Sequence, residues 1–343
     1  MAQDPTSPAE ALLQLISGYT SAQVVHVAAK LRLADLLAGG PRSVEDLAVA
    51  SDTHAPSLAR LVRALAALGI VAEAGDGRIA LAALGYPLQS DTSDSIRDAV
   101  LFLVGEWAWR PWGDLLYSVR TGEPAFDRIF CMSNFEYWEH NPEAGAIYDA
   151  FFLTMARAAN GPIIAAYDFS RFATIVDVGG STGALLAPIL QGHPTTRGVL
   201  FDLPHVVAGA EQVLAEAGVA DRCAVIGGSF FDSVPPGGDA YLLKYIIHGW
   251  DDERAVAILR RCREAMASGS VLLLVEQVLP EHLEAGAAAQ GLARLDLQML
   301  VLTPGGRERT EQEFRSLLWG AGFDLQKVIP TASPFRILEA SPV

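Results

Sequence analysis

Cysteine is scarce in this sequence, which holds only Cys131, Cys223 and Cys262 among its 343 residues. Thiols so few and so far apart exclude a disulfide framework, a cysteine-based zinc site and a redox pair. The chain also lacks an uninterrupted apolar run of membrane-spanning length. Its first residues, Met1-Ala-Gln-Asp-Pro5, have neither the basic region nor the apolar core of a signal peptide. We therefore expect a soluble, cytoplasmic protein without a membrane partner.

Basic residues are also few. The 25 Lys and Arg are outnumbered by 40 Asp and Glu, giving a formal net charge of −15 and a pI near 4.8. Binding to nucleic acid needs a basic surface that displaces counterions, so DNA and RNA are poor candidate partners. No cluster of His, Cys and carboxylate residues has the spacing of a metal site, and we expect no metal.

Hydrophobic residues make up 51% of the chain, enough for a large core and two domains. Residues 1–95 form the first expected domain, with a buried helix face from Val24 to Leu37, a helix after the Ser43 cap and a third helix over Pro56–Leu68. A hairpin with its turn at Asp76-Gly77 follows, so the pattern predicts three helices and a wing.

A winged helix has two common uses, DNA recognition and the pairing of chains. The third helix carries Arg60 and Arg63, which favours DNA. The acidic balance of the chain and its apolar Leu12, Leu13, Leu15 and Ile16 favour pairing. We expect a dimerisation domain.

Residues 96–166 form a helical linker with many aromatic residues. Aromatic residues at helical spacing are most often core, although some can line a pocket for a flat ligand. From residue 167 to 343, strand and helix patterns alternate. The expected strands are Thr174–Val178, Gly198–Phe201, Cys223–Ile226, Ala240–Tyr245 and Val271–Glu276. Helices are expected between them, over Val206–Ala217 and Glu253–Met266, and an antiparallel pair at the end. This pattern predicts an α/β fold, a Rossmann-like parallel sheet with an antiparallel edge.

A glycine-containing turn, Gly179-Gly-Ser-Thr-Gly183, ends the first of these strands. Asp202 follows Gly180 by 22 residues (202 − 180) and closes the second strand, where an acid accepts hydrogen bonds from a ribose. No Arg or Lys lies beside Asp202 to bind a phosphate, and the turn is not a phosphate loop. These features favour a nucleoside without phosphates, such as S-adenosylmethionine.

Nearly the whole chain resembles the S-adenosylmethionine-dependent O-methyltransferases of the plant caffeic-acid type and their bacterial relatives that act on polyketides and other secondary metabolites. The resemblance is carried by the glycine turn, Phe201-Asp-Leu-Pro204, the segment from Lys244 to Glu253 with His248 and Trp250, Glu276, and Gly305-Gly-Arg-Glu-Arg-Thr310. It implies a homodimer paired through the amino-terminal domain.

The resemblance also implies the cofactor-binding residues, which are Gly179, Gly180, Asp202, Leu203, Ser229, Phe230 and Lys244. Ser229 departs from the family, which commonly has Asp there. We expect adenine contact mainly from Phe230, and Asp232 remains an alternative to Ser229 for a hydrogen bond. Lys244 is expected near the cofactor carboxylate, with a surface lysine as the alternative.

His248 is the expected general base, with Glu276 and Glu308 converging on its imidazole to fix the tautomer. The alternative is an ordinary, partly buried histidine. Gly249 stands where the plant enzymes usually have Asp. Substrate walls are expected from residues of the aromatic linker and of a later helix: Trp107, Trp112, Phe151, Phe152, Met155, Asp296 and Met299.

These residues predict methyl transfer from S-adenosylmethionine to a hydroxyl of a small aromatic secondary metabolite, as in antibiotic biosynthesis, with proton removal by His248. Two alternatives share the cofactor. One is N- or C-methylation of a related natural product, and the other is a relative with non-methylating chemistry.

Overall fold

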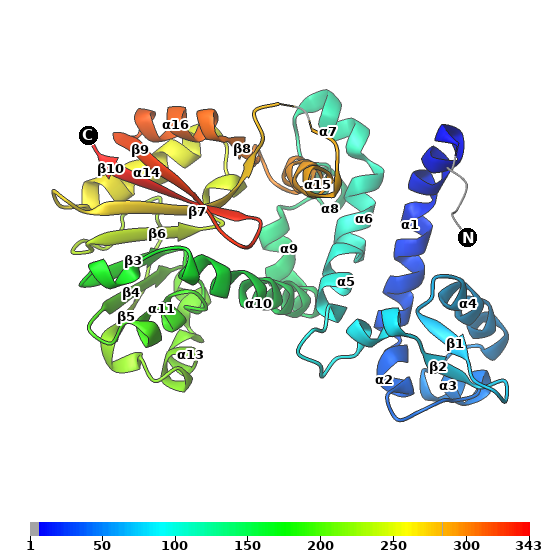
Figure 1. The fold of residues 1–343 in the computed structure, drawn as a ribbon. Helices are drawn as coiled ribbons and strands as arrows, with labels where there is room; N and C mark the ends of the chain where they lie inside the picture. Colours follow the sequence, from blue (N-terminus) through cyan, green and yellow to red (C-terminus); the bar gives the residue numbers. More distant parts are fainter. Residues whose placement is uncertain (1–6, 283) are drawn as a thin grey trace. The chain divides into compact units, whose positions relative to one another are not determined.

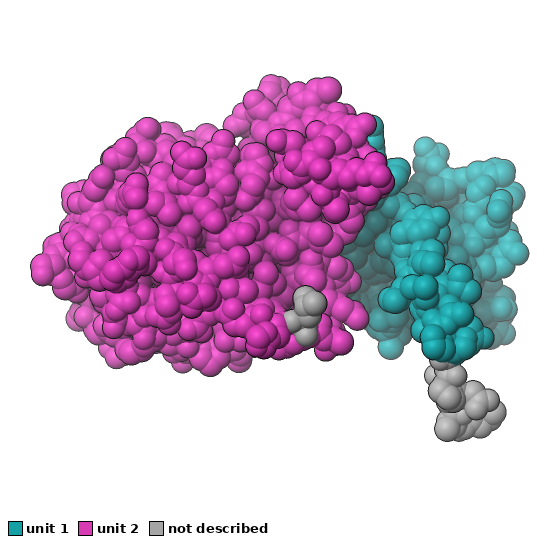
Figure 2. All heavy atoms as spheres, turned by 90° about the horizontal axis from the view of Figure 1, so that it is seen from above, with its two compact units in different colours: residues 1–110, 141–154 teal, residues 111–140, 155–343 magenta. Residues whose placement is uncertain are grey.

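The computed structural model describes residues 7–282 and 284–343. Met1–Pro5, which bear on the expected absence of a signal peptide, lie outside the described residues. The chain forms two compact units (Figure 2). The helical unit is Met1–Arg110 with Asn141–Thr154, and the sheet unit is Pro111–His140 with Met155–Val343.

The helical unit has the expected helices and wing around its own core. Its elements are α1 (Pro8–Lys30), α2 (Leu33–Leu37), α3 (Val44–Ala50), α4 (Ala55–Ala67), β1 (Val71–Glu73), β2 (Ile79–Leu81), a 3-10 turn η1 (Ala83–Leu88), α5 (Arg97–Leu103) and part of α6 (Glu106–Gly113) and α10 (Pro142–Ala165). Ser43 caps α3 by accepting from the Asp46 N–H at 3.0 Å, as its position predicts. β1 and β2 pair antiparallel as the wing.

The expected continuous helix from Val24 to Leu37 is wrong. Arg32 has φ of 54°, a left-handed conformation that ends α1 and starts α2. Apolar spacing continues across this break, which is why the sequence pattern does not show it. Leu33 and Leu37 of α2 still pack into the same core as Ala28 of α1.

The sheet unit contains the predicted parallel sheet (Figure 1). Its strands are β3 (Thr174–Val178), β4 (Arg197–Asp202), β5 (Cys223–Gly227), β6 (Ala240–Lys244), β7 (Val271–Leu279), β9 (Phe323–Pro330) and β10 (Phe335–Pro342), with the two-residue β8 (Arg309–Thr310) beside β7. The order is β5-β4-β3-β6-β7-β10-β9, in which β10 pairs antiparallel with β7 and β9. The chain therefore reverses its direction of strand addition between β3 and β6.

Helices cover both faces of this sheet because its strands are apolar on both sides. On one face, Ile175, Leu200 and Leu242 pack with Leu186 of α11, and on the other, Val176, Tyr241 and Leu243 pack with α14 and α16. The helices that follow β3 in the chain are α11 (Leu186–Gly192), α12 (Pro204–Val207), α13 (Ala210–Glu216), α14 (Asp252–Ala265), α15 (Ala287–Leu302) and α16 (Glu311–Gly320). The expected helix over Val206–Ala217 is divided into α12 and α13.

The predicted linker contains the short helices α7 (Leu115–Thr121), α8 (Ala125–Phe130) and α9 (Asn134–His140), and the turn η2 (Phe169–Arg171) follows it. Thr310 and Glu313 form the predicted capping box at the start of α16. Within the described residues, none of the helices combines the length and apolar composition that crossing a membrane requires.

Candidate active site

The expected site residues gather where the parallel strands end. Gly179 follows β3, Asp202 ends β4, Lys244 ends β6, and Glu276 lies one residue beyond Val275, the β7 partner of Lys244. In open α/β sheets, ligands bind outside the carboxyl ends of the strands, where the strand order reverses. That point lies between β3 and β6 here, so we describe first its β3–β4 side and then its β6–β7 side.

The glycine turn leaves no room for side chains against the strand end. Gly179 has φ of 72°, which disfavours other residues. A Cβ atom on Gly180 would lie 2.6 Å from Oδ2 of Asp177. The turn thus lets a ligand approach the backbone closely.

Asp177 lies beneath this turn and is 2% exposed. Its Oδ2 is buried and has no hydrogen-bond partner among the described residues. Burial raises the pKa of this carboxyl to about 7, and the charge of Asp202 adds to the rise while Lys244 opposes it. A buried oxygen without a partner fits a site that a polar ligand completes.

Asp202 occupies the position predicted for ribose binding. Its Oδ2 accepts from the Ser181 N–H at 2.9 Å, and its Oδ1 accepts from the Leu203 N–H at 2.7 Å. The carboxylate is thereby held at the mouth of the glycine turn. Burial raises its pKa, while these two backbone bonds work in the opposite direction.

Phe230 and Ser229 follow β5 and lie beside the same turn. The Phe230 Cε1 atom would be 3.7 Å from a Cβ on Gly179, and the Phe230 ring packs edge-on against Trp250 at 6.1 Å between centroids. Ser229 Oγ accepts from the Phe231 N–H at 3.2 Å, and the Ser229 carbonyl accepts from the Asp232 N–H at 3.0 Å. Phe230 is therefore placed to stack on a ring at this strand end.

Lys244 is held inside the protein rather than at its surface. Its Nζ donates to Asn160 Oδ1 at 2.7 Å, and Asn160 Nδ2 donates to the Ala184 carbonyl at 2.7 Å. Burial lowers the pKa of Lys244 to about 8, although Asp177 raises it. The sequence interpretation missed Asn160. A polar residue in the apolar stretch Ala158–Ile164 of α10 is the signal that could have found it.

His248 lies in the turn η4 (Ile247–Gly249) after β6 and is 6% exposed. Its Nδ1 is 2.7 Å from Glu308 Oε1. Because a carboxylate can only accept, this bond assigns the proton of a neutral imidazole to Nδ1 and leaves the lone pair on Nε2. Burial lowers the pKa of His248, but the bond to Glu308 and the charges of Glu276 and Glu308 outweigh it and raise the pKa above 6.5.

The sequence interpretation expected both carboxylates to converge on the imidazole. Among the described residues, however, Glu276 forms no hydrogen bond with His248. Its Oε1 accepts from the Ile246 N–H at 3.1 Å and the Ile247 N–H at 2.8 Å, so it holds the backbone before His248. Burial and the charge of Glu308 raise its pKa to about 7, against the opposing influence of His248 and of the two backbone bonds. Among the described residues, Glu308 alone forms a hydrogen bond with the imidazole, and Glu276 acts on His248 through its charge and through the backbone.

Arg309 fixes the other side of this turn and was also missed. It is fully buried and donates to the Ile247 carbonyl at 3.0 Å, the Trp250 carbonyl at 2.8 Å and Asp252 Oδ1 at 2.8 Å. Asp251, Asp252 and Glu253 meanwhile begin α14, with Asp251 as its cap. Gly249 therefore lies within a turn that side chains anchor from two directions.

The expected substrate residues fall into both units. In the sheet unit, Trp112 Nε1 donates to Gln298 Oε1 at 2.5 Å, and Asp296 Oδ1 accepts from the Glu308 N–H at 2.9 Å. Asp296 thus binds the backbone of Glu308, the residue whose carboxylate bonds His248. Met155 is 43% exposed, and the Met299 carbonyl accepts from Thr303 Oγ1 at 2.7 Å.

The remaining three belong to the helical unit and pack around Phe102. The Phe151 ring stacks on Phe102 at 4.5 Å, the Phe152 ring lies 6.0 Å from it, and Trp107 Nε1 donates to the Phe102 carbonyl at 2.9 Å. These contacts are those of an aromatic core.

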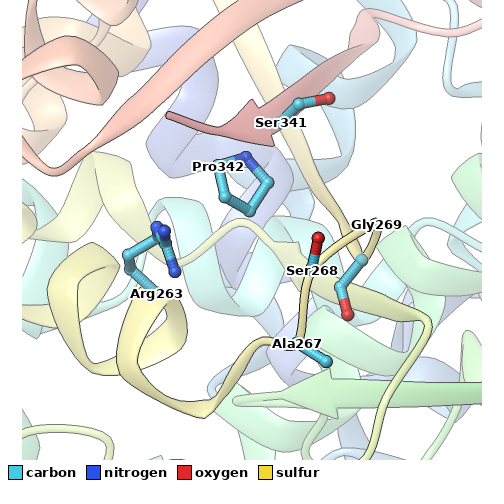
Figure 3. Close-up of a pocket in the computed structure, with 7 residues that line it drawn as sticks. Arg263, Ala267, Ser268, Gly269, Ser341 and Pro342 are labelled. Carbon is cyan, nitrogen blue, oxygen red and sulfur yellow. The ribbon is translucent and has the colours of Figure 1, made fainter.

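A surface hollow of about 350 Å³ lies at the other end of the sheet, lined by Arg263, Ala267–Ser270, Ser341 and Pro342 (Figure 3). Gly269 and Ser270 precede β7, so this hollow lies at the amino end of the parallel strands, away from His248. Over residues 7–282 and 284–343, no group of three or more His, Cys, Asp or Glu is arranged to hold a metal ion.

Asp202 and the buried imidazole of His248 thus lie at the carboxyl ends of a Rossmann-like sheet, where nucleoside ligands bind in this class of fold. Two family models match the chain, an O-methyltransferase domain over residues 112–324 and an O-methyltransferase dimerisation domain over residues 13–86. The chain belongs to the O-methyltransferase family, whose members use S-adenosylmethionine, and is an enzyme of that kind.

Named relatives span almost the whole chain. It is 44% identical to phenazine O-methyltransferase PhzM of Lysobacter antibioticus, over 97% of this chain and 96% of the relative. It is 40% identical to O-demethylpuromycin-O-methyltransferase of Streptomyces alboniger, over 97% and 89%. A relative with a different acceptor is the 8-amino-8-demethylriboflavin N,N-dimethyltransferase of Streptomyces davaonensis, 35% identical over 92% and 90%.

Among solved structures, the O-methyltransferase NcsB1 from neocarzinostatin biosynthesis was determined with S-adenosylmethionine and 2-hydroxy-5-methyl naphthoic acid. It matches with a TM-score of 0.83 and 34% identity, covering 94% of this chain and 96% of that one. These findings confirm the predicted fold class, enzyme class and cofactor.

Proposed function

We propose that this enzyme methylates a hydroxyl group of a small aromatic natural product, with His248 as the general base. The observation that carries the proposal is the 2.7 Å bond between His248 Nδ1 and Glu308, which leaves Nε2 free to accept a proton. The relatives act on phenazine, naphthoate and related aromatic compounds by name, which supports an aromatic acceptor.

The residues around the glycine turn fit S-adenosylmethionine. Gly179 and Gly180 leave the backbone open, and Asp202, with Leu203 beside it, accepts from the ribose hydroxyls. Phe230 stacks on the adenine with Ser229 at its edge, and Lys244 binds the carboxylate of the methionine end. When bound, the cofactor supplies an activated methyl group, so the protein has only to align the acceptor oxygen and remove its proton.

His248 performs that removal. A phenol with a pKa near 10 is neutral at about pH 7, and an oxygen attacks better as its proton leaves. The raised pKa of His248 makes its neutral ring a stronger base than a free imidazole. Glu308 holds the Nδ1 proton, and Glu276 stabilises the imidazolium by its charge while anchoring the Ile246–Ile247 backbone.

The acceptor pocket is proposed from Trp112, Met155, Asp296 and Met299 in the sheet unit. The other expected substrate residues, Trp107, Phe151 and Phe152, belong to the helical unit and are not part of this pocket proposal. Two protomers are proposed to pair through the dimerisation domain, where α1 exposes Leu12, Leu13, Leu15, Ile16 and Tyr19, each more than half exposed. A homodimer would cover this apolar surface.

N-methylation is the second candidate because a relative of similar length is named for an aromatic amine. A neutral amine has a free lone pair before its proton leaves, so it depends less on a base. Mass spectrometry of products from matched phenol and aniline acceptors separates the two functions.

The decisive test is His248→Ala assayed with a panel of hydroxylated phenazines and naphthoates. We expect S-adenosylhomocysteine binding to persist and kcat to fall by about 10² to 10⁴. His140→Gln is the control, since His140 is exposed and its Nδ1 bonds the Glu136 carbonyl of its own helix. Retained turnover in His248→Ala would remove His248 as the base.

A further inference from the structure

Tyr245 lies between Lys244 and His248 in the sequence and has an unusual backbone conformation. It follows Lys244, the last residue of β6, and precedes the turn that carries His248. Its φ is 61°, and its N–H donates to the Val275 carbonyl at 3.0 Å. A bulky residue in this left-handed region is strained and persists only where its surroundings hold it. Strain of this kind occurs preferentially at functional sites.

The backbone of Tyr245 holds its aromatic ring against His248. The Tyr245 ring stacks on the His248 imidazole, with centroids 3.9 Å apart and planes inclined by 29°. Phe335 of β10 packs edge-on against the Tyr245 ring at 5.2 Å. The Tyr245 hydroxyl accepts from Gln277 Nε2 at 3.4 Å. Neighbours on β7 and β10 therefore fix the ring, and the ring in turn covers one face of His248.

The other groups acting on His248 approach it differently. Glu308 bonds its Nδ1 edge, Glu276 is a buried carboxyl behind the same turn, and the Arg309 guanidinium is a nearby positive charge. A single hydrogen bond at Nδ1 directs one ring edge but still permits the ring plane to tilt. A ring packed on the imidazole face opposes that tilt. An aromatic face also attracts a cation, and hence the imidazolium more than the imidazole.

We propose that Tyr245 is a positioning residue for the base, fixing the plane of the His248 ring and stabilising the imidazolium formed when Nε2 takes the acceptor proton. This rests on the proposed role of His248. The proton leaves the acceptor oxygen and binds Nε2, while the Nδ1 proton stays in the bond to Glu308. Burial raises the pKa of the Tyr245 phenol well above its usual value, so Tyr245 keeps its own proton throughout.

The test compares Tyr245→Leu with Tyr245→Phe by the pH dependence of kcat. The leucine variant loses the aromatic face, so we expect kcat to fall by about 3- to 30-fold and the acid limb of its pH profile to move about half to one unit lower. The KM for S-adenosylmethionine should stay within about twofold. The phenylalanine variant retains the ring and should rescue most of both effects.

Tyr241→Leu is the matched control. Tyr241 is a buried tyrosine near the amino end of β6, the strand that ends just before Tyr245, and its hydroxyl donates to the Ala265 carbonyl. Its loss should lower thermal stability without moving the acid limb. A Tyr245→Leu profile that also keeps the wild-type acid limb overturns the proposal.

A measurement on the unmodified protein covers the case in which Tyr245→Leu does not fold. A ring stacked on an imidazole shifts the NMR resonances of its protons upfield, and His248 is assigned by comparison with His248→Asn. We expect the His248 resonances upfield of those of the other histidines, and their absence there rejects the stacking. Failure of the base itself is distinguishable, because His248→Ala would then retain turnover whatever Tyr245 does.

Discussion

The proposed cofactor side and the proposed base side treat their basic groups in opposite ways. On the cofactor side, formed by Asp177, Asp202 and Lys244, burial moves the pKa of Asp177 up to about 7 and that of Lys244 down to about 8. Both changes disfavour the charged forms. On the base side, formed by His248, Glu276 and Glu308, the surroundings favour the charged form of His248 and raise its pKa.

This difference indicates what each side would bind: a charged ligand on the cofactor side and a proton on the base side. The cofactor side has a partly uncompensated acid and base, with Asp177 Oδ2 unpartnered among the described residues, so a ligand that carries both charges completes it. The base side already contains the negative charge that an arriving proton needs. Only three residues, Tyr245 to Ile247, separate Lys244 of the proposed binding side from His248 of the proposed proton-transfer side.

Glu308→Gln tests the base side and should have the largest effect. A glutamine amide can donate as well as accept, so it neither fixes the Nδ1 tautomer nor supplies a charge for the imidazolium. We expect kcat to fall by about 10² to 10³, with the affinity for S-adenosylhomocysteine unchanged within about threefold.

Steady-state kinetics with titration calorimetry measures both quantities. Glu311→Gln is the control, because Glu311 is a partly exposed glutamate of α16 that pairs with Arg315. A large loss of cofactor affinity in Glu308→Gln would show that the two sides are not separate in function.

Lys244→Met tests the cofactor side and should give the reverse pattern. Methionine fills a similar volume but loses the charge and the 2.7 Å bond to Asn160. We expect the Kd for S-adenosylhomocysteine to rise by about 10- to 100-fold, while kcat at saturating cofactor falls less than about threefold. Lys327→Met, at an exposed lysine of β9, is the control. An unchanged Kd would contradict the assignment of Lys244 to the cofactor.

Glu276→Gln should have the smallest effect, which is a change in how the folding stability depends on pH. The folded protein holds the Glu276 proton up to about pH 7, against a usual value of 4.5, so the folded state binds more protons between these values. Stability from this group is full below about pH 4.5 and is lost as the pH rises through about 7.

Glutamine keeps an oxygen for the Ile246 and Ile247 N–H groups but does not titrate. The unfolding free energy of the wild type should decrease from about pH 5 to about pH 8.5, as Glu276 loses its proton. We expect this decrease to be about 1–2 kcal/mol smaller in the variant. Urea unfolding at the two pH values measures it. Equal decreases in variant and wild type would show that Glu276 ionises normally.

The sequence predicts the sheet closely because its signals are local. β3 matches its expected range of Thr174–Val178, and α16 ends at the predicted Gly320. Apolar runs, the Thr310 cap and the final antiparallel pair depend on neighbours in sequence. The breaks at Arg32 and between α12 and α13 were missed because apolar spacing continues through them.

The site is less predictable because its contacts join distant segments. The strand ends place Asp202, Lys244 and His248, but Asn160 meets Lys244 across 84 residues and Arg309 meets Ile247 across 62. The division of tasks between Glu276 and Glu308 depends on side-chain directions that no spacing specifies. Tyr245 was missed because a strained φ leaves no mark in residue type.

The anchoring of the His248 turn by Glu308 and Arg309 sets an order of assembly. The strands that carry the proposed cofactor side, β3 to β6, end at Lys244. Glu308, the partner of the His248 imidazole, comes 60 residues after His248. A chain that ended between His248 and Glu308 would therefore lack the acid that holds the Nδ1 proton of this imidazole.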